Sequence, residues 1–442
     1  MSEAEPRRVP ASVGQRLLWF LDRHRGHSGA LNCPMVCRIR GPLDEPALAS
    51  CLETLTRRHE ALRTTFTGRG RQLAQVIHEP RPLAVERRDL SGLPDPAAEV
   101  EQALAAELRT RVDPEVWPVR CTLWQVGPGD HVLCLNLHHL VTDTWSCGIL
   151  HQELARAYAS AVGAGPGLSP PGWQYADFAA WQEGLLGSDR FRRHEDYWRR
   201  QLQGAEAPPI PLGPGGAGAA AGRWGSEEAD VVPEVAEKLR GLARGLRTTP
   251  FAVMLAICSS ALHRLTGGED LALASQFANR SRPEVAGTVG FIANQVVLRT
   301  RLPARATFSD VVAATRATVL DGFAHQELPH HLVPRDPPRD AGGDALRLDD
   351  VVFQMLAEPL EVAVDAGRAR FEGMVPDVVG RFDFELGIMP RGRGFGVKLF
   401  YAADRLDPAW AQLFVATYVS VAAEVAARPE APIGAQSAMR TR

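Results

Sequence analysis

The chain has 442 residues, of which 45% are hydrophobic and 23% charged, a composition typical of globular proteins. This length exceeds what one ordinary hydrophobic core organises, so it predicts two or three domains. The 49 basic and 52 acidic residues leave a formal net charge of -3, which gives no overall electrostatic reason to bind nucleic acid or an anionic membrane.

Cysteine usage and hydropathy indicate the compartment. Seven cysteines are scattered without a CxxC pair, which favours a reduced, cytoplasmic protein without disulfides. The N-terminal residues lack the apolar core of a signal peptide, and the longest apolar run, 251–258, is shorter than the roughly 18 residues of a membrane span. We therefore expect a cytoplasmic protein without a membrane segment, and a buried helix at 251–258.

The first half shows helix and strand patterns in turn. Residues 44–66 carry leucines at helical spacing behind Asp44 and Pro46, which predicts an amphipathic helix that runs into a strand. Residues 131–139 alternate like a strand, and 146–162 place apolar side chains on one helical face. The stretch HHLVTDTWS at 138–146 therefore lies at a strand–loop–helix junction.

The second half repeats this alternation after a break. Residues 205–225 are rich in proline and glycine, which predicts a flexible connection, and we place the boundary just before it, with lobes at 1–185 and 186–442. Beyond it, the patterns predict helices around 233–246 and 250–265, and strands at 271–277 and 291–300.

The two adjacent histidines differ in their surroundings. If the strand continues through them, His139 shares a face with Leu133, Leu135 and Leu137, whereas His138 points to the opposite face. Desolvation disfavours a charged imidazole and keeps it able to accept a proton near neutral pH. This favours His139 as a base and His138 as a positioning residue.

Other interpretations of the pair remain open from these residues alone. Two ordinary histidines at a strand end would look the same. A metal site is disfavoured because His139 and Asp143 are four residues apart on a strand and turn, not on a helix, so no metal is expected. The chain has no GxSxG elbow, no GxxxxGK[ST] loop and no GxGxxG fingerprint, which removes support for a hydrolase triad or a nucleotide site.

The same stretch resembles the HHxxxDGxS signature of nonribosomal peptide synthetase condensation domains. Further segments resemble other motifs of that family, in the family's order and over nearly the whole chain: SVGQRLLWFL at 12–21, RHEALRTTF at 58–66, YADFAAWQ at 175–182, GTVGFIANQVVLR at 287–299, HQELP at 325–329 and RFDFEL at 381–386.

The resemblance implies a fold and a reaction. The fold is α/β (α+β), with two chloramphenicol-acetyltransferase-like lobes in a V-shaped pseudo-dimer and a tunnel between them. The reaction is attack by an amine, or an alcohol, on an acyl thioester held on the phosphopantetheine arm of a peptidyl or acyl carrier protein. The chain itself would bind no cofactor, and its acceptor would be a small molecule or a tethered group.

The resemblance also gives roles to single residues. His139 matches the catalytic histidine, with His138 beside it, and Asp143 would pair with an arginine of the other lobe, for which Arg280 is the best candidate. Backbone N–H groups before the helix at 146 would meet the developing oxyanion. Trp145, Ser146 and Asn294 would shape the tunnel or cap the helix.

Some positions depart from the family pattern. Thr144 replaces a glycine, where a β-branched side chain would penalise positive φ and reduce the tunnel volume. Gln295 replaces a threonine, and His330 and His331 replace a Phe-Glu pair; we expect these two histidines to be solvated.

No carrier-domain serine motif and no adenylation domain are found, so we expect a free-standing enzyme that meets its carriers in trans. Two alternatives are a catalytically silent recruitment platform with the same fold, which Thr144 favours and the intact HHxxxD residues oppose, and a coenzyme A-dependent HxxxD acyltransferase, whose DFGWG motif is missing.

Overall fold

The computed structural model divides the chain into two compact units. It describes residues 5–24, 29–213, 224–302, 305–333, 346–356, 363–374 and 382–433. The first unit is Met1–Asp189, Ala278–Ala293 and Pro359–Val378, and the second is Arg190–Phe277, Asn294–Glu358 and Val379–Arg442. The first division falls four residues after the predicted boundary at 185, but two later segments join the first unit, so a single cut is incomplete. The predicted connection at 205–225 lies partly outside the described residues.

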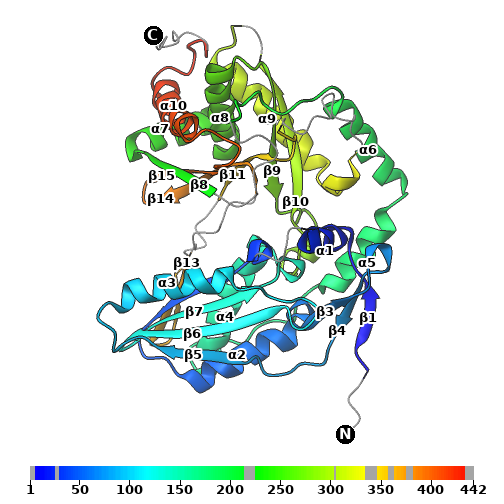
Figure 1. Cartoon of the computed structure of the whole chain (residues 1–442), viewed down its shortest axis with the longest axis vertical. Coiled ribbons are helices and arrows are strands. Elements are labelled where there is room, and N and C mark those ends of the chain that lie inside the picture. Colours follow the sequence, from blue (N-terminus) through cyan, green and yellow to red (C-terminus); the bar gives the residue numbers. More distant parts are fainter. Residues whose placement is uncertain are drawn as a thin grey trace. The chain divides into compact units, whose positions relative to one another are not determined.

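The first unit is built on a six-stranded sheet (Figure 1). Only the edge pair β5–β6 is parallel, and the other neighbours are antiparallel. In sheet order, the strands are β12 (Ala363–Ala366), β13 (Ala369–Met374), β2 (Met35–Arg40), β7 (Asp130–Leu137), β6 (Val119–Gly127) and β5 (Val85–Asp89). A second sheet of this unit has the order β1 (Arg7–Pro10), β4 (Ala74–Ile77) and β3 (Thr64–Thr67).

Strand alternation gives the six-stranded sheet two apolar faces. Leu133 and Leu135 of β7 belong to the larger cluster with α2 (Glu45–Arg58) and α4 (Thr144–Ala161). Val132 and Cys134 belong to a smaller cluster with α3 (Pro96–Arg109), which lies on the other side of the sheet in Figure 1. The predicted helix at 44–66 is confirmed as α2, whose N-cap Asp44 accepts a hydrogen bond from the Ala47 amide.

Two further helices of this unit, α1 (Val13–His24) and α5 (Tyr175–Leu185), carry the segments that resemble the first and fourth family motifs. The 3₁₀ turns of the unit are η1 (Gly29–Leu31), η2 (Glu60–Arg63), η3 (Gly70–Gln72), η4 (His139–Val141) and η6 (Pro283–Val285).

The second unit has its own six-stranded sheet, in which β11 runs parallel to both of its neighbours. Its order is β10 (Asn294–Arg301), β9 (Asp270–Phe277), β11 (Val351–Met355), β14 (Phe384–Arg391), β15 (Gly394–Ala402) and β8 (Trp224–Val231). Its helices are α6 (Asp189–Leu202), α7 (Pro233–Gly245), α8 (Pro250–Thr266), α9 (Phe308–Ala324) and α10 (Pro408–Ala427), with one 3₁₀ turn, η7 (His330–Leu332). The predicted buried helix at 251–258 is confirmed within α8, and β10 begins three residues later than the strand predicted at 291.

One helix of the second unit, α10, is long and apolar enough by composition to cross a membrane. It packs against α7, α8, β8 and β15 of its own unit, and its inward side chains Phe414, Tyr418 and Val421 are buried. This packing is that of a core helix.

Asp350 lies in the turn that leads into β11, close to two other carboxylates. Burial, then the negative charges of Asp383 and Asp349, raise the pKa of Asp350 to about 6. In the unfolded chain an aspartate titrates near about 3.9. Between these two values the folded state binds more protons than the unfolded state, so unfolding becomes easier as pH rises through this window.

We therefore expect Asp350→Asn to raise the free energy of unfolding near pH 7.5 by up to about 2 kcal/mol, with no gain below pH 4. Urea midpoints at pH 4.5, 6 and 7.5 measure this difference. Asp365→Asn, whose side chain is 82% exposed, is the control that should change little. Parallel pH profiles for wild type and Asp350→Asn would contradict the assignment.

Candidate active site

The HHLVTDTWS stretch joins β7 to α4. β7 ends at Leu137, His138 forms an isolated bridge with Asn32, and His139 begins the 3₁₀ turn η4. The strand therefore ends two residues before the predicted limit of 139, and strand alternation does not reach His139. The two histidines nevertheless differ, because His138 is buried and His139 is half-buried.

His139 has a defined tautomer. Its Nδ1 lies 2.7 Å from the carbonyl oxygen of Thr142. A carbonyl oxygen only accepts, so Nδ1 carries the hydrogen and the neutral ring has its lone pair on Nε2. The edge of the ring also meets Phe291, with centroids 5.1 Å apart and planes at 80°. This geometry suits an imidazole that takes a proton at Nε2.

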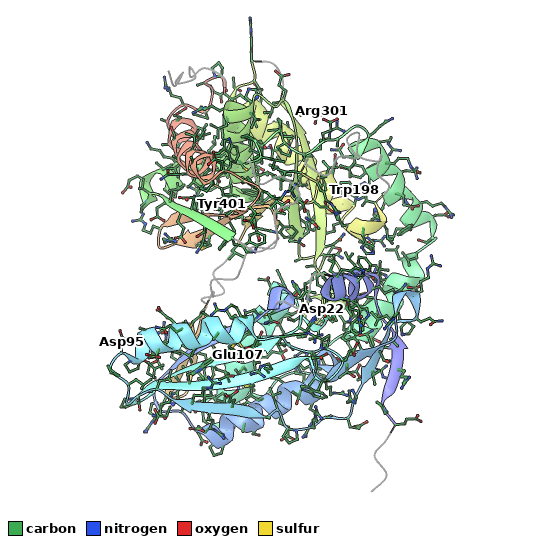
Figure 2. The ribbon with its side chains drawn as sticks, in the orientation of Figure 1. Asp22, Asp95, Glu107, Trp198, Arg301 and Tyr401 are labelled. Atoms are coloured by element: carbon green, nitrogen blue, oxygen red, sulfur yellow. The ribbon has the colours of Figure 1, made fainter. Side chains whose placement is uncertain are left out.

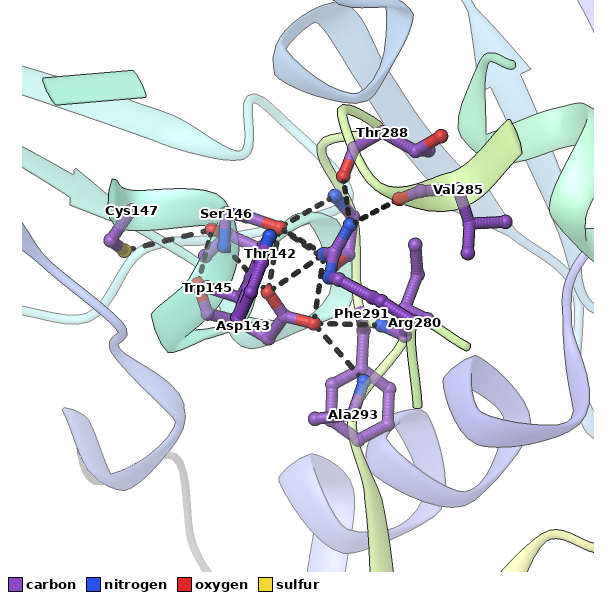
Figure 3. Close-up of polar contacts among 12 residues, drawn as sticks. Thr142, Asp143, Trp145, Ser146, Cys147, Arg280, Val285, Thr288, Phe291 and Ala293 are labelled. Atoms are coloured by element: carbon purple, nitrogen blue, oxygen red, sulfur yellow. Dashed lines mark hydrogen bonds and ion pairs between the residues drawn. The ribbon is translucent and has the colours of Figure 1, made fainter. Parts of the chain in front are cut away.

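Asp143 is the N-cap of α4 and binds more than its own helix (Figure 3). Its Oδ1 accepts hydrogen bonds from the amide and the hydroxyl of Ser146, each at 2.7 Å. Its Oδ2 accepts from the amides of Ile292 and Ala293, each at 3.0 Å. One carboxylate therefore joins the start of α4 to a segment about 150 residues later in the chain.

Arg280 completes this contact, as predicted. Its Nη2 lies 3.1 Å from Oδ1 and 3.2 Å from Oδ2 of Asp143, and its Nη1 donates to the carbonyls of Val285 and Thr288. Both side chains are almost fully buried.

Burial alone would raise the pKa of Asp143, but the charge of Arg280 and the hydrogen bonds from Ser146 and Ile292 outweigh it and hold that pKa below its ordinary value. Loss of one partner of a buried pair typically costs about 3–5 kcal/mol, since the other charge remains buried.

The partner comes from a different part of the fold than expected. We expected Arg280 on the second lobe, but residues 278–293 belong to the first unit. The pair therefore holds the first unit together internally.

Thr144, Trp145 and Ser146 form the first turn of α4. Thr144 is exposed and helical, and among the described residues the non-glycine positive φ values occur only at Arg247, Asn279 and Arg305, so the predicted backbone penalty at Thr144 is wrong. The indole of Trp145 donates to the Ala286 carbonyl at 3.2 Å and is otherwise half exposed. The Ser146 hydroxyl accepts from the Gly290 amide at 3.1 Å in addition to its bond with Asp143.

Gly290 explains part of the GTVGF segment. Its φ is +156°, and a Cβ built on it would lie 1.9 Å from Cδ2 of the buried Tyr175 ring. The Tyr175 hydroxyl donates to the Phe291 carbonyl at 2.8 Å and lies 2.7 Å from the Ser12 hydroxyl. Sequence reasoning gave no role to Tyr175 or Ser12, although both lie in the segments that resemble family motifs.

In the second unit, Asn294 binds the chain after α9. Its Nδ2 donates to the carbonyls of Gln326 and Leu328, and its Oδ1 accepts from the His330 amide. His330 is buried, with Nε2 3.3 Å from Oδ2 of Asp349, so the expectation that it is solvated is wrong; His331 is exposed as expected. The Gln295 amide donates to the Asp349 carbonyl, so two departures from the family pattern meet at one residue.

Within the part of the chain that the structure describes, no group of three or more His, Cys, Asp or Glu is arranged to hold a metal ion.

Comparison with known proteins decides the family, because the model of the condensation domain matches residues 6–442. The chain belongs to the condensation-domain family. Relatives include a linear gramicidin synthase of Brevibacillus parabrevis, 32% identical over 98% of this chain and 6% of the synthase, and phosphinothricin tripeptide synthetase PhsC of Streptomyces viridochromogenes, 36% identical over 73% of this chain and 30% of the synthetase. The chain thus spans a small part of these relatives.

Solved structures agree with this condensation-domain fold. The SgcC5 protein of Streptomyces globisporus has a TM-score of 0.80 at 27% identity and covers 96% of this chain and all of its own. The first condensation domain of the calcium-dependent antibiotic synthetase has a TM-score of 0.78 at 20% identity and covers 98% and 99%. The predicted α/β fold with chloramphenicol-acetyltransferase-like lobes is thereby confirmed.

Gly290→Ala should lower the free energy of unfolding by about 1–3 kcal/mol or more, because the new Cβ must displace the buried Tyr175 ring and sits on an unfavourable backbone. Urea midpoints followed by tryptophan fluorescence give the measurement. Gly287→Ala is the matched control in the same loop, since no heavy atom lies within 4 Å of its Cβ. Equal midpoints for the two variants would show that the ring moves aside without cost.

Proposed function

We propose that this chain forms an amide bond between a carrier-bound acyl thioester and an amine, with His139 as the residue that handles the proton. The observation that supports this most directly is the hydrogen bond from His139 Nδ1–H to the Thr142 carbonyl, which places the lone pair on Nε2 of a half-buried ring. Membership of the condensation-domain family supplies the reaction class.

The proton balance defines what His139 does. An α-amino group with a pKa of about 8 is mostly protonated at pH 7 and cannot attack until it loses a proton. The amine nitrogen bonds to the thioester carbonyl carbon, the C–S bond breaks, and the sulfur leaves as a thiol. Nε2 of His139 takes the proton that the nitrogen loses and returns it to the departing sulfur, so charge and atoms balance.

Asp143 acts in this scheme through position, since its oxygens are occupied by Arg280, Ser146 and backbone amides. The same contacts limit which amides can meet the oxyanion. The Ser146 amide is bound by Asp143, so the amides of Thr144 and Trp145, in the first turn of α4, remain the candidates.

The donor would be presented on the phosphopantetheine arm of a carrier protein, because relatives of this chain are synthetases of nonribosomal peptides. We propose that these carriers act in trans, that the acceptor is a small molecule or a second carrier-bound group, and that the reaction takes place in the cytoplasm. No nucleic acid or membrane takes part in this scheme.

An alcohol acceptor is the second candidate and would give an ester. The SgcC5 structure, 27% identical to this chain, is a complex with an aryl ethanediol, which supports including hydroxyl acceptors in any assay.

We expect His139→Ala to lower kcat by about 10²–10⁴-fold, since a positioned general base contributes on that order. The test loads a candidate carrier with an acyl donor, adds amine or alcohol acceptor, and follows product by intact mass spectrometry. His331→Ala, an exposed histidine of the second unit, should retain wild-type turnover.

Full activity of His139→Ala would remove its catalytic role. Product from acyl-coenzyme A without a carrier would favour the coenzyme A-dependent alternative, and a stable complex with a biosynthetic oxygenase without any product would favour the recruitment platform.

Thr144→Gly and Thr144→Ala should both raise turnover of bulky donors several-fold while leaving small donors unchanged. The backbone at Thr144 is helical, so alanine fits as well as glycine and only side-chain volume differs from wild type. Turnover of a donor series of increasing size measures this. Acceleration by glycine alone would mean that backbone freedom matters, and no change in either variant would mean that Thr144 does not limit donor access.

A further inference from the structure

Helix α1 lies against the turn that carries the two histidines. Gln15 is buried on this helix, and its Nε2 donates to the Leu140 carbonyl at 2.9 Å. Asp22 lies two helical turns later on the same face and is also buried, with Oδ1 3.7 Å from Nε2 of His138. Figure 2 labels Asp22 on this helix. One helix thus reaches both sides of η4.

The His138 ring is oriented by its other nitrogen. Nδ1 of His138 accepts the Leu140 amide hydrogen at 3.1 Å, so the neutral ring carries its hydrogen on Nε2. That Nε2 is fully buried and has no hydrogen-bond acceptor within bonding distance, while the Asp22 carboxylate lies just beyond it. A buried N–H without an acceptor is costly, and a negative charge at 3.7 Å offsets that cost while favouring the Nε2–H tautomer.

Leu140 is therefore held on both sides. Its N–H is bound by His138 and its C=O by Gln15, and His139 lies between His138 and Leu140 in the chain. A misplacement of about 1 Å at a reacting group can cost about 10²-fold in rate. The orientation of the His138 ring thus controls the turn that presents His139.

We propose that Asp22 is a positioning residue for His139, which it holds through the ring of His138 and the Leu140 amide. Arg111 lies on the other side of this carboxylate, with Nη2 3.8 Å from Oδ2, and balances its charge. The inference rests on the proposed role of His139 in condensation and adds the residue that fixes its placement.

The test compares Asp22→Leu, which removes both charge and acceptor at similar volume, with Asp22→Asn, which keeps an acceptor oxygen. We expect Asp22→Leu to lower kcat about 10–100-fold with KM for donor and acceptor changed less than about twofold, and Asp22→Asn to restore most of the activity. Glu183→Gln is the matched control, because Glu183 also anchors α1, through Arg16, but does not contact η4; its kcat should match wild type.

A second readout does not depend on activity. In ¹⁵N-histidine spectra, the His138 signals, assigned by difference from His138→Gln, should show the Nε2–H form in wild type and lose it in Asp22→Leu, while the urea midpoint falls by less than for Gly290→Ala. Unchanged kcat and unchanged His138 signals in Asp22→Leu would overturn the inference. If His139→Ala retains full activity, it is the proposed function that fails, and the His138 tautomer still reports on Asp22.

Discussion

The buried pair of Asp143 and Arg280 is the contact on which the first unit depends. Asp143 caps α4, and its two oxygens also bind the guanidinium and the amides of Ile292 and Ala293. The charges can be buried because every oxygen has donors and because Nη1 of the arginine is bound by two carbonyls. The pair fixes the start of α4 and the 278–293 segment in one step.

The catalytic proposal follows from that constraint. Once α4 begins at Thr144, the chain between β7 and α4 has few conformations, and η4 must fit within it. The Thr142 carbonyl then lies where it binds Nδ1 of His139. Asp143 thus acts on the reaction without touching substrate, and Gln15 and Asp22 hold the same turn from α1.

Much of this arrangement could be predicted from the sequence, for physical reasons. Period-2 and period-3.6 patterns indicated β7, α2 and α8, because burial of apolar faces dictates them. The Asp143–Arg280 pairing could be predicted from the family resemblance and the need of a buried carboxylate for a cation. The position of Arg280 in the first unit could not, since periodicity along the chain does not report which unit a loop joins.

Other errors came from treating positions as independent. Thr144 was expected to strain the backbone because the family has glycine there, but the residue is the first of a helix and needs no positive φ. His330 was expected in solvent, yet Asp349 binds it, and Gln295 contacts the same residue. Only three-dimensional contacts show that these two substitutions share a neighbour.

The strand pair β12–β13 has a consequence for biosynthesis of the chain. β13 pairs with β2, which begins at Met35, although β13 itself ends at Met374. A ribosome-bound chain therefore exposes the unpaired edge of β2 until roughly 300 further residues have emerged, and open edges invite wrong partners. Most of the second unit is synthesised in that interval, so the unit that begins first is the one that cannot be completed first.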